Sequence, residues 1–226
     1  MSCREASRCV LLFSRSAREE SAAKRLPGCS ALFDSSRRRI IDAAGSLPGV
    51  DLFIPRQRGS GFGQRLINAF IDARALGYRV IVAVPTDIPE LDQARIVEAF
   101  AALESHPSTF GRSTDGGVYL LGVTAEADLD RLLSGVRWNS SSVFCDLAAN
   151  APEAAILGAE LADIDHRSDL VAMTGRAGLD AGVAALILAL LSRPAVPRPE
   201  PVRRVASRRH AVRLAGRSPP GAHASF

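Results

Sequence analysis

The chain has 226 residues, of which 47% are hydrophobic and 23% charged, a composition typical of a globular domain that buries a core. Only 5% of the residues are aromatic, which argues against a stacking platform for single-stranded nucleic acid. From Arg193 onward there are eight Arg and one Glu, so residues 1–192, with 20 basic and 23 acidic residues, carry a net charge of about −3. A mildly acidic body is not typical of a nucleic-acid-binding protein.

Neither the cysteines nor the apolar runs indicate export or membrane insertion. The four cysteines form no Cys-x-x-Cys pair, so we interpret them as free thiols of a reducing compartment and predict a cytoplasmic protein. The apolar run Val10–Phe13 is too short for a signal peptide. The run Ala181–Leu191 has about half of the roughly 20 residues that a membrane span needs, so we expect no membrane span.

The secondary structure is predicted from apolar runs, periodicity and turn residues. The continuous apolar run Cys9–Phe13 indicates a buried parallel strand, and a polar loop is expected from there to Gly28. The predicted elements that follow, in chain order, are a helix over 30–45, a strand over 50–54, a helix that opens at Gly59–Gly63 and closes at Gly77, a strand over 79–84, a helix over 89–104 with Pro89 in its first turn, strands over 108–111 and 118–123, helical segments around Trp138, a last strand over 161–165 and two helices ending near Leu191.

Strands that alternate with helices predict an α/β fold in three layers, with a mostly parallel sheet, helices on both faces and right-handed crossovers. We expect one domain over residues 1–192. Residues 193–226 hold six of the thirteen Pro and show almost no apolar periodicity, so we predict a disordered tail rich in Arg and Pro.

Several acids fall where an open α/β sheet places its functional site, beyond the carboxyl ends of the strands. Asp87 follows the strongest predicted strand, Asp115 lies in a turn between two strands, and Asp163 and Asp165 lie in the last predicted strand. Carboxylates there can hold Mg²⁺ or Mn²⁺, which neutralises a departing diphosphate. For each acid alone, a helix cap or a turn former is the alternative interpretation.

Phosphate binding is predicted for the segment after the first strand. Lys24, the only lysine of the chain, and Arg25 lie where the phosphates of a nucleotide would lie, although a solvated pair of charges would look the same. The segment Gly59-Ser-Gly-Phe-Gly63 fits a phosphate loop and fits equally a plain loop before a helix.

Three segments carry a resemblance to a known family: Gln57-Arg-Gly-Ser-Gly-Phe-Gly-Gln-Arg65, Thr86-Asp-Ile-Pro-Glu-Leu91 and Asp115-Gly-Gly-Val-Tyr-Leu-Leu-Gly122. They resemble the DUF2064 proteins, which are GT-A-like proteins of the nucleotide-diphospho-sugar transferase type, some labelled as glycosyltransferases of arsenosugar biosynthesis. Val136-Arg-Trp-Asn-Ser140 and residues 162–170 are similar to later motifs of the family. The resemblance implies a GT-A-like sheet, a metal at Asp87 and Asp165, and an acceptor pocket formed by Gly116, Gly117 and Trp138.

From these residues we predict metal-dependent transfer of a sugar from a nucleoside diphosphate sugar to a small-molecule acceptor. Asp115 would orient the acceptor hydroxyl or act as its base, and the nucleotide phosphates would contact four residues: Lys24, Arg25, Gly63 and Arg65. One alternative is a nucleotidyltransferase of the same fold. The other is a non-catalytic nucleotide-binding protein, favoured by Glu20, which stands where the family has a Gly that approaches phosphate, and by the short region between residues 26 and 57.

We expect deletion of residues 193–226 to leave the melting temperature nearly unchanged, because this region lacks a pattern that could form a core. Thermal denaturation of the full chain and of a chain truncated at Arg193 measures the difference. A large drop on truncation would show that the tail packs against the domain.

Overall fold

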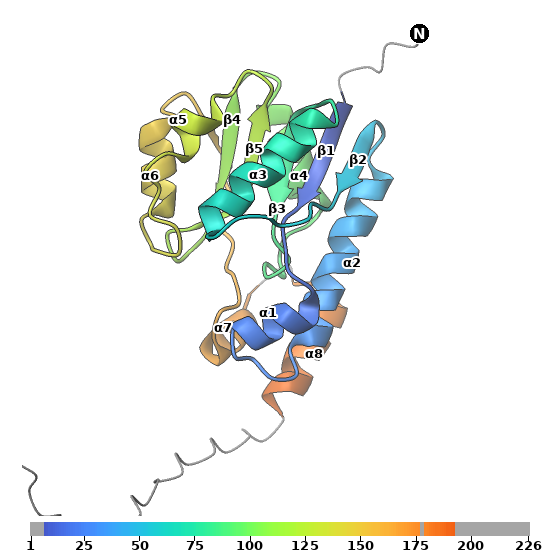
Figure 1. The fold of residues 1–226 in the computed structure, drawn as a ribbon. Helices are drawn as coiled ribbons and strands as arrows, with labels where there is room; N and C mark the ends of the chain where they lie inside the picture. Colours follow the sequence, from blue (N-terminus) through green and yellow to red (C-terminus); the bar gives the residue numbers. More distant parts are fainter. Residues whose placement is uncertain (1–6, 177–178, 193–226) are drawn as a thin grey trace, which may run out of the picture. The chain divides into compact units, whose positions relative to one another are not determined.

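The computed structural model describes residues 7–176 and 179–192 (Figure 1). Contacts group these described residues into one compact unit, and the predicted tail, residues 193–226, lies outside the described residues. In the described part of the chain, no helix combines the length and the apolar character that a membrane crossing requires.

One six-stranded sheet forms the centre of the domain, in the order β2-β1-β3-β5-β4-β6. Five strands run in one direction, and only β5 runs antiparallel to its neighbours β3 and β4. This confirms the predicted α/β fold with a mostly parallel sheet. The strands are β1 (Ser7–Leu12), β2 (Val50–Phe53), β3 (Tyr78–Val84), β4 (Ser108–Arg112), β5 (Val118–Thr124) and β6 (Ala155–Ile156).

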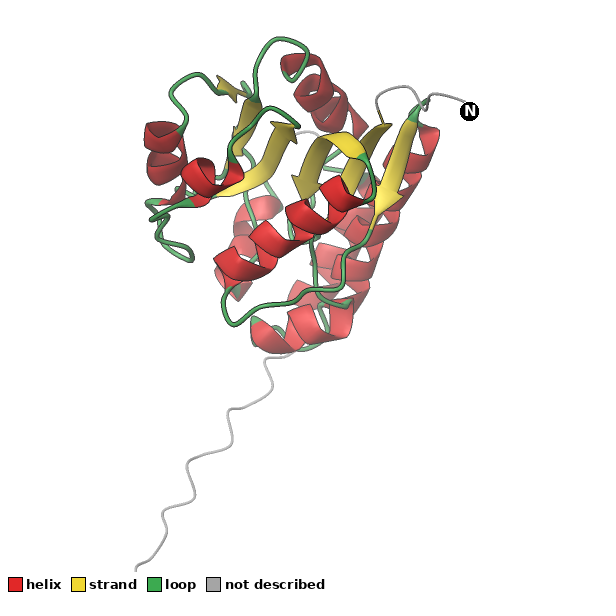
Figure 2. Cartoon of the chain, turned by 45° about the horizontal axis from the view of Figure 1, so that its top comes forward, coloured by secondary structure: helices red, strands yellow, loops and turns green. Residues whose placement is uncertain are grey.

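Helices cover both faces of the sheet, as predicted (Figure 2). Alternate residues of each strand point to opposite faces, so Leu11 packs under one layer of helices and Val10 under the other. On the first face lie α3 (Phe62–Ala75), α5 (Leu129–Leu133) and α6 (Val143–Asn150). On the second lie α4 (Gln93–Ala102) and part of α2 (Ser30–Ser46).

A third hydrophobic cluster lies beyond the carboxyl ends of the parallel strands (Figure 1). It joins α1 (Ala17–Ala23) and the start of α2 to α7 (Arg167–Met173) and α8 (Ala181–Leu191). The sequence of α8 is apolar throughout, and it buries Val183, Ile187 and Leu190 at helical spacing. This cluster brings helices from the early and the late part of the described chain together beyond the carboxyl ends of the strands.

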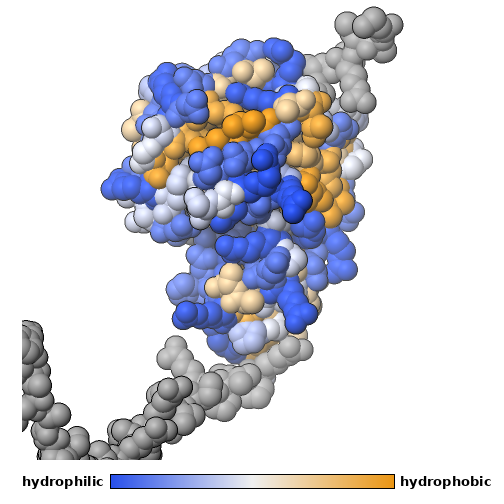
Figure 3. Space-filling model, in the orientation of Figure 1, coloured by the Kyte–Doolittle hydropathy of each residue, from blue (hydrophilic) through white to orange (hydrophobic). Residues whose placement is uncertain are grey.

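The surface of this compact unit is mostly hydrophilic in the orientation of Figure 1, with hydrophobic areas in the part that contains the sheet (Figure 3). The exposed large hydrophobic side chains among the described residues are spread over several elements: Ile54, Ile71, Leu76, Val97, Ile156, Val171 and Leu188. Scattered exposure of this kind is normal for a globular domain.

The predicted polar loop after the first strand is wrong, because residues 17–23 form helix α1. Ser16 caps the helix by accepting a hydrogen bond from the backbone N–H of Glu19. In return, the Glu19 carboxylate accepts from the backbone N–H of Ser16 at 3.0 Å. This Ser-x-x-Glu capping box is a recognised signal for the start of a helix, and it was present in the sequence.

Two further boundaries differ from the prediction. The helix predicted from Pro89 begins at Gln93, because the side chain of Asp92 accepts from the backbone N–H of Arg95 and caps the helix. The predicted last strand over 161–165 does not form as a strand; it makes an isolated bridge from Leu161 to Ser113. The edge of the sheet next to β4 is instead occupied by the two residues of β6.

We expect Gly111→Ala to destabilise the fold by about 1–3 kcal/mol, because it forces a methyl group into a filled core. A Cβ on Gly111 would lie 2.4 Å from Cζ of Tyr119, whose side chain is buried. The matched control is Gly45→Ala in α2, where a Cβ meets nothing within 4 Å. There we expect the free energy of unfolding to rise by about 0.5–1 kcal/mol, because alanine is the better helix former. Urea denaturation measures both, and equal effects would contradict the close contact.

Candidate functional site

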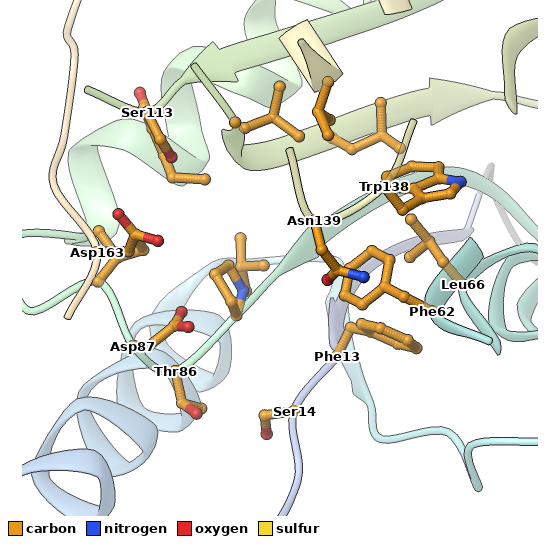
Figure 4. Close-up of a pocket in the computed structure, with 18 of the residues that line it drawn as sticks. Phe13, Ser14, Phe62, Leu66, Thr86, Asp87, Ser113, Trp138, Asn139 and Asp163 are labelled. Carbon is orange, nitrogen blue, oxygen red and sulfur yellow. The ribbon is translucent and has the colours of Figure 1, made fainter. Parts of the chain in front are cut away.

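A cavity of about 570 Å³ opens at the carboxyl edge of the sheet. Its walls come from segments that are distant in the sequence: the residues after β1, helix α1, the segment after β3, the turn between β4 and β5, and residues 138–141. Figure 4 shows Phe13, Phe62 and Trp138 on one side of the cavity and Asp87 and Asp163 on the other. The cavity therefore has an aromatic side and an acidic side.

Lys24 contacts Asp87 and Asp165, the two carboxylates predicted to be metal ligands. Its Nζ donates to Asp87 Oδ2 at 2.5 Å, to Asp165 Oδ1 at 2.6 Å and to the backbone carbonyl of Ile164 at 2.8 Å. These contacts use all three N–H groups of the ammonium. Asp87 and Asp165 thus converge on one point, although 78 positions separate them in the sequence.

The pKa of Lys24 reflects this crowding. Burial alone would lower the pKa, but the charge of Asp87 and the hydrogen bonds to Asp165 and Asp87 outweigh it, and the pKa lies above its ordinary value. Only 11% of the Lys24 side chain is exposed. Lys24 is therefore a charged, nearly buried cation held by carboxylates.

A second group of carboxylates adjoins this lysine. Asp115, Asp163 and Asp165 each place a carboxylate oxygen within 4.8 Å of those of the other two. Burial, together with the charges of Asp115, Asp165 and Asp87, raises the pKa of Asp163 to about 6. Carboxylate oxygens are the ligands that Mg²⁺ and Mn²⁺ prefer, so the donor set fits a hard divalent cation.

Asp163 was named with Asp165 among the candidate acids, but the predicted metal site included only Asp87 and Asp165. The signal for it was the spacing Asp163-Ile-Asp165, which in extended backbone points both carboxylates to the same side. The structure gives Asp163 a place on the cavity wall together with Asp165.

Glu20 adds a further carboxylate to the acidic side. It lies on α1, is buried and lines the cavity. Its carboxylate is 3.8 Å from Nζ of Lys24 and 3.6 Å from a guanidinium nitrogen of Arg15. Burial and the charge of Asp87 raise the pKa of Glu20. In all, five carboxylates and three cationic side chains line the cavity: Glu20, Asp87, Asp115, Asp163 and Asp165, with Arg15, Lys24 and Arg65.

The four residues predicted to contact phosphate do not share one place. Lys24 and Arg65 line the cavity, whereas Arg25 and Gly63 do not. Arg25 is exposed and follows α1 with a left-handed backbone (φ 55°). Gly63 has a packing role, because a Cβ at this position would lie 2.3 Å from Nε1 of Trp138. The cavity walls thus give no support to a phosphate contact at Arg25 or Gly63.

The residues predicted for the acceptor side lie together. Asp115 is exposed, and its Oδ1 accepts from the backbone N–H of Gly117 at 2.8 Å, which orients the carboxylate within the turn. Gly116 has φ 91°, and a Cβ there would lie 2.2 Å from the carbonyl oxygen of Ser141. Only glycine suits both the backbone conformation and this close approach. Asp115 and Gly117 line the cavity; Gly116 packs behind it.

Three rings form the aromatic side of the cavity. Phe13 and Phe62 meet edge to face with centroids 5.5 Å apart, and Phe62 and Trp138 meet at 5.1 Å. We call Phe13, Phe62 and Trp138 the aromatic wall. Gly63 allows the indole of Trp138 to lie directly on α3, so the wall depends on a residue without a side chain.

Comparison with known families finds one match. The family described as an uncharacterized protein conserved in bacteria (DUF2064) matches residues 33–140. The matched region includes Asp87, Asp115 and Trp138, while Lys24 and Asp165 lie on either side of it. No curated protein sequence matches this chain.

Two solved structures are similar to this chain to different degrees. A protein from Desulfovibrio desulfuricans G20, provisionally described as a nucleotide-diphospho-sugar transferase, has a TM-score of 0.68 and 19% identity, covering 83% of this chain and 97% of its own. Rv0371c from Mycobacterium tuberculosis H37Rv has a TM-score of 0.45 and 17% identity, covering 75% of this chain and 98% of its own. The first similarity shows that the fold is of the nucleotide-diphospho-sugar transferase, GT-A-like type, as predicted.

Because Trp138 is the only tryptophan of the chain, its fluorescence reports on the aromatic wall. We expect Gly63→Ala to shift the emission to longer wavelength, since the new methyl group would push the indole toward water, and to cost about 1–3 kcal/mol of stability. Gly61→Ala is the matched control, because a Cβ there meets nothing within 4 Å. An unchanged emission in Gly63→Ala would contradict the packing of Trp138 on α3.

Proposed function

We propose that the chain transfers a sugar from a nucleoside diphosphate sugar to a small acceptor, with a divalent metal ion, because residues 33–140 match the DUF2064 family and the chain shares the fold of a protein provisionally described as a nucleotide-diphospho-sugar transferase. The observation that carries the proposal is the acidic side of the cavity, where carboxylates outnumber cationic side chains. A diphosphate entering alone would be repelled there. A diphosphate that arrives with a divalent cation would be attracted.

The metal would be held by Asp87 and Asp165, the two carboxylates that converge on one point. A bound Mg²⁺ or Mn²⁺ would neutralise the charge that develops on the departing diphosphate. Asp163 and Asp115 would add negative charge around this position, since their oxygens lie within 4.8 Å of an oxygen of Asp165. Arg65, which lines the cavity and makes no ion pair with another described residue, would contact phosphate.

The acceptor would bind between the aromatic wall and the turn that carries Asp115. Trp138 is half-buried and offers a flat apolar face, which suits the apolar face of a ring-shaped acceptor. Asp115 is exposed to the cavity, so its carboxylate would accept a hydrogen bond from the acceptor hydroxyl and take its proton during transfer. The backbone N–H of Gly117 holds that carboxylate in place.

A second function, nucleotide binding without catalysis, is favoured by one observation: every N–H of Lys24 is already taken by protein oxygens. A lysine in this state has no hydrogen-bond donor left for a phosphate. The two functions differ in turnover, because only the transferase consumes a nucleotide sugar. A nucleotidyltransferase of the same fold would instead release pyrophosphate from a nucleoside triphosphate.

We expect calorimetry to show binding of at least one of UDP, GDP, ADP and CDP in the presence of Mn²⁺, and much weaker binding in EDTA. Asp165→Asn should weaken the Mn²⁺-dependent binding by roughly ten- to a hundredfold, because a charge-assisted contact contributes about 1.5–3 kcal/mol. The matched control is Asp42→Asn, which removes an exposed carboxylate of α2 outside the cavity.

The absence of binding to all four nucleotides, with and without Mn²⁺, would refute the proposed function. An equal loss of Mn²⁺-dependent nucleotide affinity in Asp165→Asn and Asp42→Asn would refute the metal site. Binding without hydrolysis or transfer of any nucleotide sugar would favour the non-catalytic alternative.

A further inference from the structure

Three oxygen atoms from two separate segments converge on the Nζ of Lys24. This nitrogen lies 2.5, 2.6 and 2.8 Å from oxygens of Asp87, Asp165 and Ile164. Hard divalent cations take oxygen ligands at about 2.0–2.6 Å, so the same three oxygens could coordinate such a cation with small adjustments. The ammonium and the cation cannot share this point, because both are positive and both need the same oxygens.

We propose that Lys24 is an internal cation that holds the metal position until a diphosphate provides it with other acceptors, so that the metal and the nucleotide bind together. The inference rests on the proposed function, since it requires a phosphate ligand. Lys24 thereby acts as a positioning residue: it keeps Asp87 and Asp165 together and then gives them up to the metal.

Displacement of the Lys24 ammonium by a metal ion alone costs free energy. A metal ion that enters alone must expel a nearly buried ammonium from three oxygens. Breaking a buried ion pair is costly, because the displaced charge loses its partners. The one other carboxylate paired with Nζ, Glu20 at 3.8 Å, is already shared with Arg15. The oxygens of a diphosphate would remove this cost by offering Lys24 new acceptors.

The position of Lys24 in the fold permits the exchange. Lys24 is the C-cap of α1, a helix of seven residues, so its flexible four-carbon side chain starts where the helix ends. Nζ lies 6.0 Å from the ring centroid of Phe33, which provides no hydrogen-bond acceptor that would hold it. Apart from the longer ion pair with Glu20 at 3.8 Å, the described contacts that hold the ammonium are those with the oxygens that the metal would take.

The coupling has a measurable size. If the diphosphate relieves the competition, it raises the metal affinity by a factor, and by linkage the metal raises the diphosphate affinity by the same factor. Couplings between sites commonly correspond to about 5- to 150-fold changes. Removal of the ammonium should therefore raise the affinity of the protein for the metal by a similar factor in the absence of any phosphate ligand.

The first experiment measures the affinity of the full chain for Mn²⁺ alone, from the electron paramagnetic resonance signal of free Mn²⁺. We expect Lys24→Met to bind Mn²⁺ about 5- to 150-fold more tightly than the wild type, because the competing ammonium is gone. The matched control is Arg15→Met, which removes the same charge from the cavity wall without touching Asp87 or Asp165. For Arg15→Met we expect the affinity for Mn²⁺ to rise by less than about threefold, because the charge that is removed is partly exposed.

The second experiment follows the lysine itself in the wild-type chain and so does not depend on the folding of a variant. Lys24 is the only lysine, so ¹⁵N-lysine labelling gives a single side-chain ammonium resonance. Addition of Mg²⁺ alone at millimolar concentration should leave this resonance in place. Addition of Mg²⁺ with inorganic pyrophosphate should shift it, because the ammonium then leaves the carboxylates for phosphate.

Two results would overturn the inference: equal Mn²⁺ affinities in Lys24→Met and Arg15→Met, or a lysine resonance that Mg²⁺ alone shifts as much as Mg²⁺ with pyrophosphate. These failures are distinct from failure of the proposed function. If no nucleotide binds in calorimetry while Lys24→Met still gains Mn²⁺ affinity selectively, Lys24 guards a metal position and the transferase proposal fails.

Discussion

Electrostatic repulsion at the carboxyl edge of the sheet is the constraint on which the site depends. Five carboxylates line one cavity, and they come from α1, from the segment after β3, from the β4–β5 turn and from the segment before α7. Carboxylates this close destabilise one another unless cations lie between them. Lys24 meets this need by bridging Asp87 and Asp165, and the bridge also ties α1 and the segment before α7 to the end of β3.

A separate, steric constraint gives the glycines near the cavity their roles. The backbone of Gly116 and the ring of Trp138 each approach a neighbouring segment so closely that a Cβ would collide. At Gly116 the approach fixes the turn that carries Asp115, and at Gly63 it seats the aromatic wall on α3. Gly63 and Gly116 therefore serve close packing next to the cavity, which differs from the phosphate contact predicted for Gly63.

The sequence supported the prediction of the sheet because its central strands are continuous apolar runs, such as the one in β3, that few other structures accommodate. It also indicated, through the family resemblance, that Asp87 and Asp165 would share one metal site, although the strand predicted over 161–165 does not form. It did not reveal that Lys24 lies between them, because that contact joins residues 63 and 141 positions apart. Helix α1 was missed although its capping box was visible, since seven mostly polar and small residues resemble a loop.

The third hydrophobic cluster has a consequence for the order in which the protein matures. Its helices come from both ends of the described chain, α1 and α2 from the beginning and α7 and α8 from the end. On the ribosome, all strands of the sheet emerge before Asp165, so until then Lys24 has only Glu20 and Asp87 as carboxylate partners. Domains generally fold as their residues become available. The acidic side of the cavity is therefore completed last. Before Asp165 has emerged, the chain contains the strands of the sheet but lacks the contact between Lys24 and Asp165.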